Sequence, residues 1–207
     1  NEESGEYKYY KVDEAGHLIK GWYEDEDSRM YYYNADGSRA DGVQTIDGRT
    51  YYFDGWNGMQ RNIAVESDGY LCYFGSDGTQ QSKQAISKDG WIKAGSDWYY
   101  AKNGALVKNQ FVTSGNYTYY MGNYGTMYVD SVFSVYDEEN DEYIYYRTDA
   151  AGHLVKGWYQ EQDDDEWYYY LSDGSQAIGI HTINGKTYYF SRRGVMQKNA
   201  IAVENGY

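Results

Sequence analysis

The sequence predicts an all-β chain in which about nine β-hairpins stack into an elongated β-solenoid. Aromatic residues make up 19% of the 207 residues, with 29 Tyr against 5 Phe. A ring with a polar tip suits a thin structure with much surface, because it buries one end and keeps the other in water. The chain has 24 Gly and 0 Pro, which predicts many tight turns. An aromatic pair followed by Gly recurs along the whole length, as is typical of repeat architectures.

The repeat has a period near 21 residues, with two longer connections before Gly104 and Gly152. Its nine instances are Tyr9-Tyr10 with Gly16, Tyr32-Tyr33 with Gly37, Tyr52-Phe53 with Gly58, Tyr73-Phe74 with Gly78, Tyr99-Tyr100 with Gly104, Tyr119-Tyr120 with Gly125, Tyr145-Tyr146 with Gly152, Tyr169-Tyr170 with Gly174, and Tyr189-Phe190 with Gly194. The spread of spacings fits loop insertions in a fixed unit.

Each unit is predicted to form one β-hairpin. An aromatic strand is followed by a turn of four to six residues with Asp-Gly or Asn-Gly, and then by a short second strand such as Met59-Gln60. Side chains alternate along a strand, so aromatic residues within 50–53 fall on both faces. One face can pack on the neighbouring hairpin while the other offers rings outward. Because a single hairpin is unstable in water, the units must stack.

A longer similarity lies over the short repeat. The string Ala-Gly-His-Leu-Ile-Lys-Gly-Trp-Tyr at 15–23 returns with one change at 151–159. We therefore expect a single array over 1–207 with a first block of three hairpins at 1–70, divergent hairpins at 71–142, and a block at 143–207 that duplicates the first.

Charge and composition exclude several classes of function. A net charge of −14 argues against nucleic acid, whose phosphates require clustered cations. No run approaches the roughly 18 apolar residues of a membrane span, so membrane insertion is not expected. The lone Cys72 has no partner for an internal disulfide and is expected to act as a small apolar residue. The sequence lacks a signal peptide at Asn1 and stops at Tyr207, the first aromatic residue of a further repeat. It is therefore expected to be a fragment, covalently linked to a larger parent protein.

The chain resembles the superfamily of cell-wall-binding and choline-binding repeats, which includes the glucan-binding repeats of glucansucrases and the receptor-binding repeats of clostridial toxins. The strings at 42–53 and 182–190 are similar to the glucan-binding and toxin type. The Gly157-Trp158 pair, followed by Trp167-Tyr168-Tyr169, is closer to the choline-binding type. The resemblance implies a non-catalytic module that attaches a larger secreted or cell-surface bacterial protein to polysaccharide or cell-wall glycan, with an α-glucan as the favoured ligand.

The resemblance to glucan-binding and choline-binding repeats implies a set of candidate ligand-binding residues, whose types suit the chemistry of sugars. A flat ring stacks on the apolar face of a pyranose, while amide, ammonium or carboxylate groups meet its hydroxyls. His181 stands where the first block has Gln44. The candidates are Lys20, Trp22, Gln44, Tyr51 and Tyr52 in the first block, and Lys156, Trp158, Trp167, His181, Tyr188 and Tyr189 in the last.

Two other binding functions stay open. A choline group would need a cage of aromatic faces, which Trp158, Trp167 and a Tyr of the next hairpin could form. A Gly-Trp pair stands before the aromatic strand of only three units, at 21–22, 90–91 and 157–158, which favours a neutral glycan over choline attachment to teichoic acid. The other alternative is a structural or adhesin stalk, or a toxin-like receptor-binding region.

Catalysis and cofactors are not expected. Thin stacked hairpins offer no deep pocket that excludes water, and His17 and His153 are one duplicated position that indicates turn chemistry. The acidic runs at 24–27, 137–142 and 163–166 lack the spacing of an EF-hand and are expected to be solvated loop tips, with calcium binding as the alternative.

Overall fold

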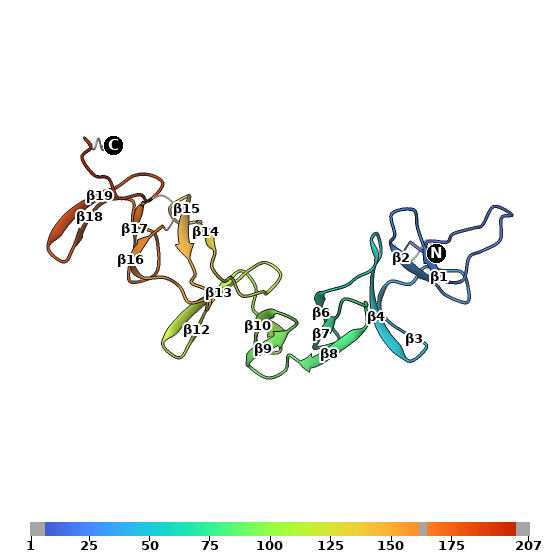
Figure 1. Ribbon diagram of the computed structural model, residues 1–207. Coiled ribbons are helices and arrows are strands. Elements are labelled where there is room, and N and C mark those ends of the chain that lie inside the picture. The colour runs from blue at the N-terminus through green and yellow to red at the C-terminus, as the bar shows by residue number, and fades with distance from the viewer. Residues whose placement is uncertain (1–6, 162–164, 202–207) are drawn as a thin grey trace. The chain divides into compact units, whose positions relative to one another are not determined.

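The computed structural model describes residues 7–161 and 165–201 and is built of β-strands alone (Figure 1). Within these residues there is no helix long and apolar enough to cross a membrane. The chain forms two compact units, residues 1–106 and 107–207. The unit boundary lies inside the predicted middle block. The all-β prediction is confirmed, while the three-block division stays a prediction.

The first unit contains four antiparallel sheets, one with two strands and three with three. Its strands are β1 (Gly21–Glu24), β2 (Met30–Tyr33), β3 (Gly42–Ile46), β4 (Arg49–Asp54), β5 (Gly58–Met59), β6 (Ile63–Ser67), β7 (Tyr70–Phe74), β8 (Gln80–Ala85), β9 (Gly90–Ala94), β10 (Asp97–Lys102) and β11 (Ala105–Leu106).

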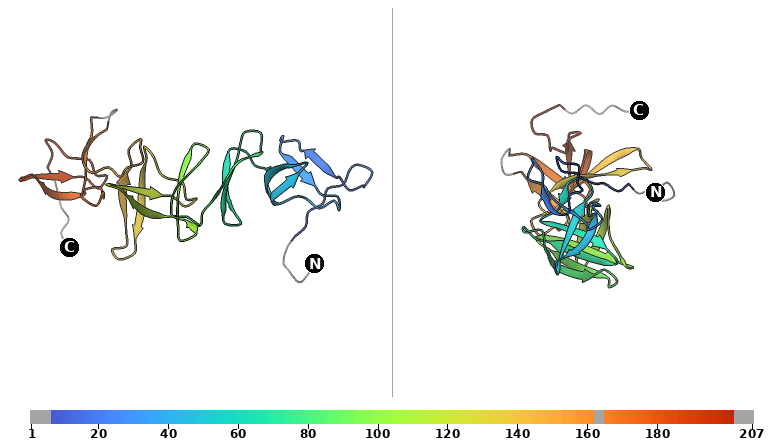
Figure 2. Two further views of the ribbon diagram at one scale, coloured as in Figure 1. Left: turned by 90° about the horizontal axis from the view of Figure 1, so that it is seen from below. Right: turned by 90° about the vertical axis from the view of Figure 1, so that its right-hand side faces the viewer.

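The second unit contains four two-stranded sheets (Figures 1 and 2). Its strands are β12 (Gln110–Ser114), β13 (Tyr117–Met121), β14 (Val132–Asp137), β15 (Glu142–Arg147), β16 (Gly157–Gln160), β17 (Trp167–Tyr170), β18 (Gly179–Ile183) and β19 (Lys186–Phe190). Of the nine predicted hairpins, eight are therefore present as sheets among the described residues. The ninth, at Tyr9-Tyr10, forms isolated bridges from Tyr10 to Ser38 and from Val12 to Leu18.

The hairpin turns use left-handed residues, as the Asp-Gly and Asn-Gly pairs predict. In β3–β4, Ile46 pairs with Arg49, which leaves the two-residue turn Asp47-Gly48 with φ of 49° and 77°. Asn184-Gly185 closes β18–β19 with φ of 49° and 75°. Two successive residues with positive φ form the type I′ turn, whose twist matches that of the flanking strands.

The main partner of most aromatic strands differs from the prediction. The sequence analysis paired each aromatic strand with the short segment after it, but the longer pairing is usually with the strand before it, as in β3–β4. The exception is β7, which pairs over five positions with β6 before it and over five with β8 after it. The following segment adds only two paired positions in β5, and a single bridge from Phe190 to Met196 in the last repeat. The two-residue turn before the aromatic strand keeps the register over five pairs, whereas the wider turn after it brings few residues into pairing range.

Neighbouring repeats within a unit are joined by a recurring backbone hydrogen bond. In these repeats the wider turn after the aromatic strand leads into a short segment, which we call the third segment. The first N–H group of the third segment donates to a backbone carbonyl in the aromatic segment of the preceding repeat. The bonds are Arg39 to Tyr9 at 2.8 Å, Leu154 to Thr118 at 2.7 Å, Gln176 to Tyr145 at 2.8 Å and Met196 to Trp167 at 2.7 Å. Stacking of adjacent hairpins therefore involves the main chain as well as the rings.

The recurring glycine also sits at this junction. Gly152 has a φ of +81°, and a Cβ added to it would lie 2.7 Å from Met127 Cε of the preceding repeat. Gly16, its counterpart in the first block, has a φ of +83° but nothing within 4 Å of such a Cβ. The glycine thus recurs about every 21 residues because its backbone has a positive φ, which favours glycine. Where a preceding repeat packs against it, as at Gly152, a side chain would also have no room.

Two matching repeats, one in each unit, contain the same small apolar core. Ala40, Ile46 and Phe53 are buried together, with Tyr51 packed against them. Ala177, Ile183 and Phe190 form the same core in the second unit. All three positions differ by 137 in residue number, so the duplication predicted from sequence extends to the packing.

Candidate functional site

Trp22 and Trp158 lie at the centre of two matching aromatic clusters. The Trp22 ring meets Tyr32 and Tyr51 edge to face, with centroid distances of 5.3 and 5.0 Å. Trp158 meets Tyr169 and Tyr188 in the same way, at 5.1 and 4.9 Å. In each cluster, one Tyr belongs to the hairpin of the Trp and the other to the next hairpin. The structure thus brings the candidate residues Trp22 and Tyr51 into contact, and likewise Trp158 and Tyr188.

The two clusters differ in one ring. Trp167 lies 6.1 Å from Trp158 at an interplanar angle of 77°. Met30 occupies the corresponding place in the first unit, two residues before Tyr32 as Trp167 is two residues before Tyr169. Trp158 therefore contacts both other rings named in the choline hypothesis, Trp167 and a Tyr of the next hairpin, and a cage around a ligand stays a prediction. The first unit has a thioether at the position of the third ring.

The second Tyr of each predicted pocket points elsewhere. Tyr51 pairs across the sheet with Gln44, whereas Tyr52 pairs with Val43 and so lies on the other face. The Tyr52 ring packs instead near Phe74, at 5.9 Å. Tyr189 likewise pairs with Ile180 and faces away from Tyr188. The expectation that both tyrosines of a block line one pocket with its lysine is therefore corrected, because the two rings lie on opposite faces of the strand. Ligand contact by any of these tyrosines stays a prediction.

Gln44 and His181 have the same structural task. The Gln44 Nε2 donates to the carbonyl of Asp41 at 2.7 Å, and the His181 Nε2 lies 3.0 Å from the carbonyl of Ile178. Each side chain thus reaches back three residues to hold the segment that leads into its strand. An imidazole can replace the amide because both place a nitrogen donor at this distance.

The two predicted lysines are exposed at the entrances of hairpins. Lys20 immediately precedes β1, and Lys156 immediately precedes β16. Their positions near Trp22 and Trp158 along the chain suit the predicted role, and ligand contact by either lysine stays a prediction.

A pocket that the sequence analysis missed lies in the first unit. It has a volume of about 460 Å³, within the range of roughly 300–1,000 Å³ that is usual for small ligands. Its lining comes from 7–9, 38–41 and 55–56, three segments that are distant in sequence. We call it the Trp56 pocket.

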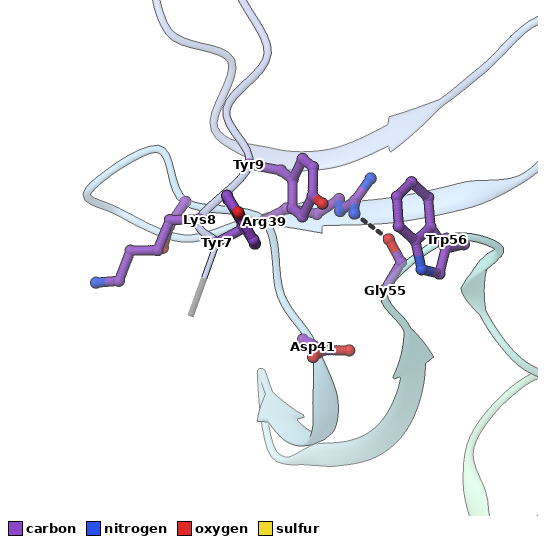
Figure 3. Close-up of a pocket in the computed structure, with 8 residues that line it drawn as sticks. Tyr7, Lys8, Tyr9, Arg39, Asp41, Gly55 and Trp56 are labelled. Atoms are coloured by element: carbon purple, nitrogen blue, oxygen red, sulfur yellow. Dashed lines mark hydrogen bonds between the residues drawn. The ribbon is translucent and has the colours of Figure 1, made fainter. Parts of the chain in front are cut away.

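Trp56 and Tyr9 form the aromatic part of this pocket. Their ring centroids are 5.8 Å apart, and 74% of Trp56 is exposed. The guanidinium of Arg39 lies 4.5 Å from the Tyr9 ring centre and donates to the carbonyl of Gly55. Figure 3 shows this bond as a dashed line, with the Arg39 side chain between the two rings in that view and Asp41 below them.

The turn that carries Trp56 is held by a carboxylate. The N–H of Trp56 and the side-chain amide of Asn57 donate to Asp54 at 2.8 and 3.0 Å. These bonds favour the ionised carboxylate and hold the pKa of Asp54 below its usual value. The Tyr31 hydroxyl donates to the carbonyl of Trp56 at 3.2 Å. Trp56 therefore projects into solvent from a braced turn, which keeps a ring face available without a large ordering cost on binding.

The pocket has the chemistry of a saccharide site. An open indole face can stack on the apolar side of a pyranose, while Arg39, Lys8 and Asp41 supply donors and an acceptor for hydroxyls. The signal that could have identified Trp56 was a large ring in a turn of small and polar residues, Asp54-Gly55-Trp56-Asn57-Gly58.

The remaining predictions concern turns and thiol chemistry. Cys72 is buried, and burial raises the pKa of its thiol, in agreement with a packing role. The N–H groups of His17 and His153 donate to Asp13 and Asp149, each at 2.8 Å, so these histidines belong to turns as expected.

The structure describes the acidic runs at 24–27 and 137–142 in full and the run at 163–166 in part. Among the described residues no three His, Cys, Asp or Glu side chains gather as a metal site. Asp25 accepts from the N–H groups of Asp27 and Arg29 at 3.0 and 2.9 Å. Part of the 163–166 run, Asp163 and Asp164, lies outside the described residues.

Comparison of the sequence with known families decides the type of repeat. The profile described as a choline-binding repeat matches residues 177–207, and the cell wall binding repeat matches residues 89–104 and 156–175. These three segments carry cell-wall-binding and choline-binding repeats. Gly157-Trp158 lies in a segment that matches the cell wall binding repeat, and the β18–β19 hairpin lies in the segment that matches the choline-binding repeat. The sequence resemblance to this superfamily is confirmed.

Curated relatives with similar repeats are streptococcal glucosyltransferases. Glucosyltransferase-S of Streptococcus mutans is 30% identical over 200 residues, which cover 92% of this chain and 13% of the relative. Glucosyltransferase-I of Streptococcus downei is 31% identical over 223 residues, which cover 95% of this chain and 14% of the relative. The chain thus spans about one seventh of the length of these enzymes.

Solved structures of streptococcal proteins also match. CbpJ from Streptococcus pneumoniae is 24% identical, with a TM-score of 0.42 over 91% of this chain and 61% of the other. Choline binding protein F from the same species, determined with a peptidoglycan analogue, is 26% identical, with a TM-score of 0.43 over 91% of this chain and 61% of the other.

Proposed function

We propose that this chain is a non-catalytic module that attaches a larger secreted bacterial protein to polysaccharide, with an α-glucan as the ligand. The observation that carries the proposal is the Trp56 pocket, where an exposed indole stands beside Tyr9 and Arg39. The similarity to glucosyltransferases over nine tenths of the chain supports a glucan, because it extends through the repeats of both units.

Several weak sites that bind the same polymer together would give the module its overall affinity. The Trp22 and Trp158 clusters lie at junctions between hairpins, and each leaves part of its central ring accessible. In this proposal the hairpins of both units continue as one elongated solenoid, so that a long polymer can engage more than one site. Once one site is bound, the linked sites meet the polymer at a high effective concentration, which strengthens overall binding without new contacts at any single site.

Retention of the whole chain on insoluble α-glucan tests this function. We expect Trp56→Ala to weaken retention at least about fivefold, because stacking of a sugar on an aromatic ring contributes on the order of 1 kcal/mol or more. Tyr124→Ala is the matched control, since Tyr124 is 79% exposed in a turn and lies outside the pocket. Equal losses in both variants would point to nonspecific adhesion and overturn the assignment of the pocket.

Choline is the second candidate ligand, and the grouping of Trp158 with Trp167 and Tyr188 favours it. A quaternary ammonium is held by aromatic faces through cation–π attraction. Retention on an immobilised amine resin and elution by free choline would support this candidate. Trp167→Ala should abolish this choline-dependent retention. Failure to bind both the resin and any α-glucan would leave a structural stalk as the function.

A further inference from the structure

The block that duplicates the Trp56 pocket contains a second pocket with a different lining. Arg39 donates its N–H to the carbonyl of Tyr9, as Gln176 does to that of Tyr145. The pairs Phe53 with Met59 and Phe190 with Met196 enclose turns of equal length, 54–58 and 191–195. Tyr145, Gln176, Arg192 and Arg193 therefore occupy the places of Tyr9, Arg39, Gly55 and Trp56.

This second pocket is rich in arginine. Its volume is about 340 Å³, and it is lined by Val132, Tyr145, Arg147, Glu161, Tyr168, Tyr170, Gln176, Arg192 and Arg193. The chain has seven arginines and a net charge of −14, yet three of the seven line this one cavity. We call it the Arg pocket.

Among the residues that the structure describes, ion pairing uses the charge of one of these arginines, Arg147. Arg147 has a side chain that is 9% exposed, and its Nη2 donates to Glu161 Oε2 at 2.5 Å. Its guanidinium also lies 4.0 Å above the Tyr159 ring, and its buried Nε has no hydrogen-bond partner among the described residues. Glu161 is thus neutralised by Arg147, and the pocket keeps the two positive charges of Arg192 and Arg193.

Arg192 and Arg193 are exposed, and neither forms an ion pair with an acidic group among residues 7–161 and 165–201. Two adjacent guanidinium groups without such partners present forked donors that match the oxygens of a phosphate or carboxylate. The exposed Tyr145 ring offers a surface for a sugar beside them.

We propose that the Arg pocket binds an anionic group, a phosphate or a carboxylate, that is carried by a glycan. The glycan part rests on the proposed function, whereas the anion part rests on the arginines alone. In this view the two copies of the pocket have diverged in specificity. The Trp56 pocket stacks a neutral sugar, and the Arg pocket selects a charged one in a chain whose overall charge repels anions.

Titration of the whole chain with glucose 6-phosphate, glucuronic acid and glucose tests the proposal, with NMR detection of the arginine Nε–H signals. We expect Arg192 and Arg193 to respond to at least one anionic sugar and to bind it at least tenfold more tightly than glucose. A response to glucose 6-phosphate alone identifies phosphate as the group, and a response to glucuronic acid alone identifies carboxylate. Equal binding of all three sugars would overturn the proposal.

Paired variants separate the pocket from general charge. Arg192→Gly with Arg193→Trp installs the residues of the first copy and should weaken binding of the anionic sugar at least tenfold. Arg61→Ala with Lys186→Ala removes the same two charges outside the pocket and should leave binding within about twofold. Equal losses in the two double variants would contradict a local site.

Retention on neutral α-glucan, measured on the same proteins, distinguishes the two proposals. Retention of the wild type together with no preference for anionic sugars would sink the anion site alone. Binding of anionic sugars without retention on any polysaccharide would sink the proposed glucan function alone.

Discussion

The indole of Trp158 meets the ring of Tyr188 edge to face, with 4.9 Å between centroids and an angle of 73°. The same contact joins Trp22 to Tyr51 at 5.0 Å and 75°. Both pairs bridge successive hairpins, so each couples the stability of one repeat to that of the next. Such aromatic pairs contribute about 0.5–1.5 kcal/mol beyond the area that they bury.

A double-mutant cycle should detect this coupling. Trp158→Leu and Tyr188→Leu together should destabilise the second unit by less than the sum of the single changes, with a difference of about 0.5–1.5 kcal/mol in urea unfolding. Tyr143→Leu is the control, because Tyr143 is 60% exposed and its ring contacts Tyr136. A coupling no larger than that of Trp158 with Tyr143 would contradict an energetic link.

The duplicated turn glycines should differ in their tolerance of alanine. Gly16→Ala should cost about 1 kcal/mol, because its backbone is left-handed but its surroundings are open. Gly152→Ala should cost at least about 1 kcal/mol more, because Met127 must also move. Unfolding curves of the two variants measure this difference in the free energy of unfolding. Equal losses would contradict the prediction, because they would mean that Met127 moves aside without loss of stability.

An exchange at position 44 tests the role shared with His181. Gln44→His should keep the stability within about 0.5 kcal/mol, since an imidazole makes the corresponding bond at His181. Gln44→Leu should cost about 1 kcal/mol through loss of the bond to Asp41. Thermal unfolding of both variants gives the comparison. A large loss for Gln44→His would show that the amide has a further partner.

Alkaline pH should destabilise the first unit through Tyr99. Burial, with a smaller contribution from the charge of Asp97, raises the pKa of Tyr99 to about 12 from an ordinary value near 10. Above pH 10 the unfolded chain releases this proton more readily than the folded one. The contribution is therefore complete below pH 10 and is lost as the pH rises towards 12.

The loss attributable to Tyr99 should reach about 2–3 kcal/mol, from two pKa units at about 1.4 kcal/mol each. Tyr99→Phe removes the titrating group, so the stability of this variant should decline less steeply between pH 9 and 11. Parallel declines of the two proteins, measured by urea unfolding, would show that other tyrosines dominate.

The sequence predicted the hairpins and much of the aromatic packing, because both depend on local patterns. The Asp47-Gly48 pair determines a turn by its own backbone preferences, and Trp22 lies one repeat from Tyr51, so stacking alone brings them together. The choice of main strand partner was wrong for all of these strands except β7, because turns of similar composition flank each aromatic strand and their sequence does not show which one supports the longer pairing.

The Trp56 pocket could not be predicted in the same way. Tyr9 and Trp56 are 47 positions apart, and their contact requires the turn after β4 to fold back over the repeat before it. The Arg pocket was hidden for the same reason, since Arg147 reaches Arg192 and Arg193 only through two intervening hairpins. Period and composition carry no information about contacts that skip a repeat.

The hydrogen bond from each third segment to the repeat before it has a consequence for how such chains change over generations. A repeat added by duplication arrives with both halves of a junction, so it can join its neighbours without new side chains. Because the aromatic clusters also lie at junctions, the number of candidate binding sites grows with the number of repeats. A duplicated site can then acquire a new specificity while the original site keeps the old one.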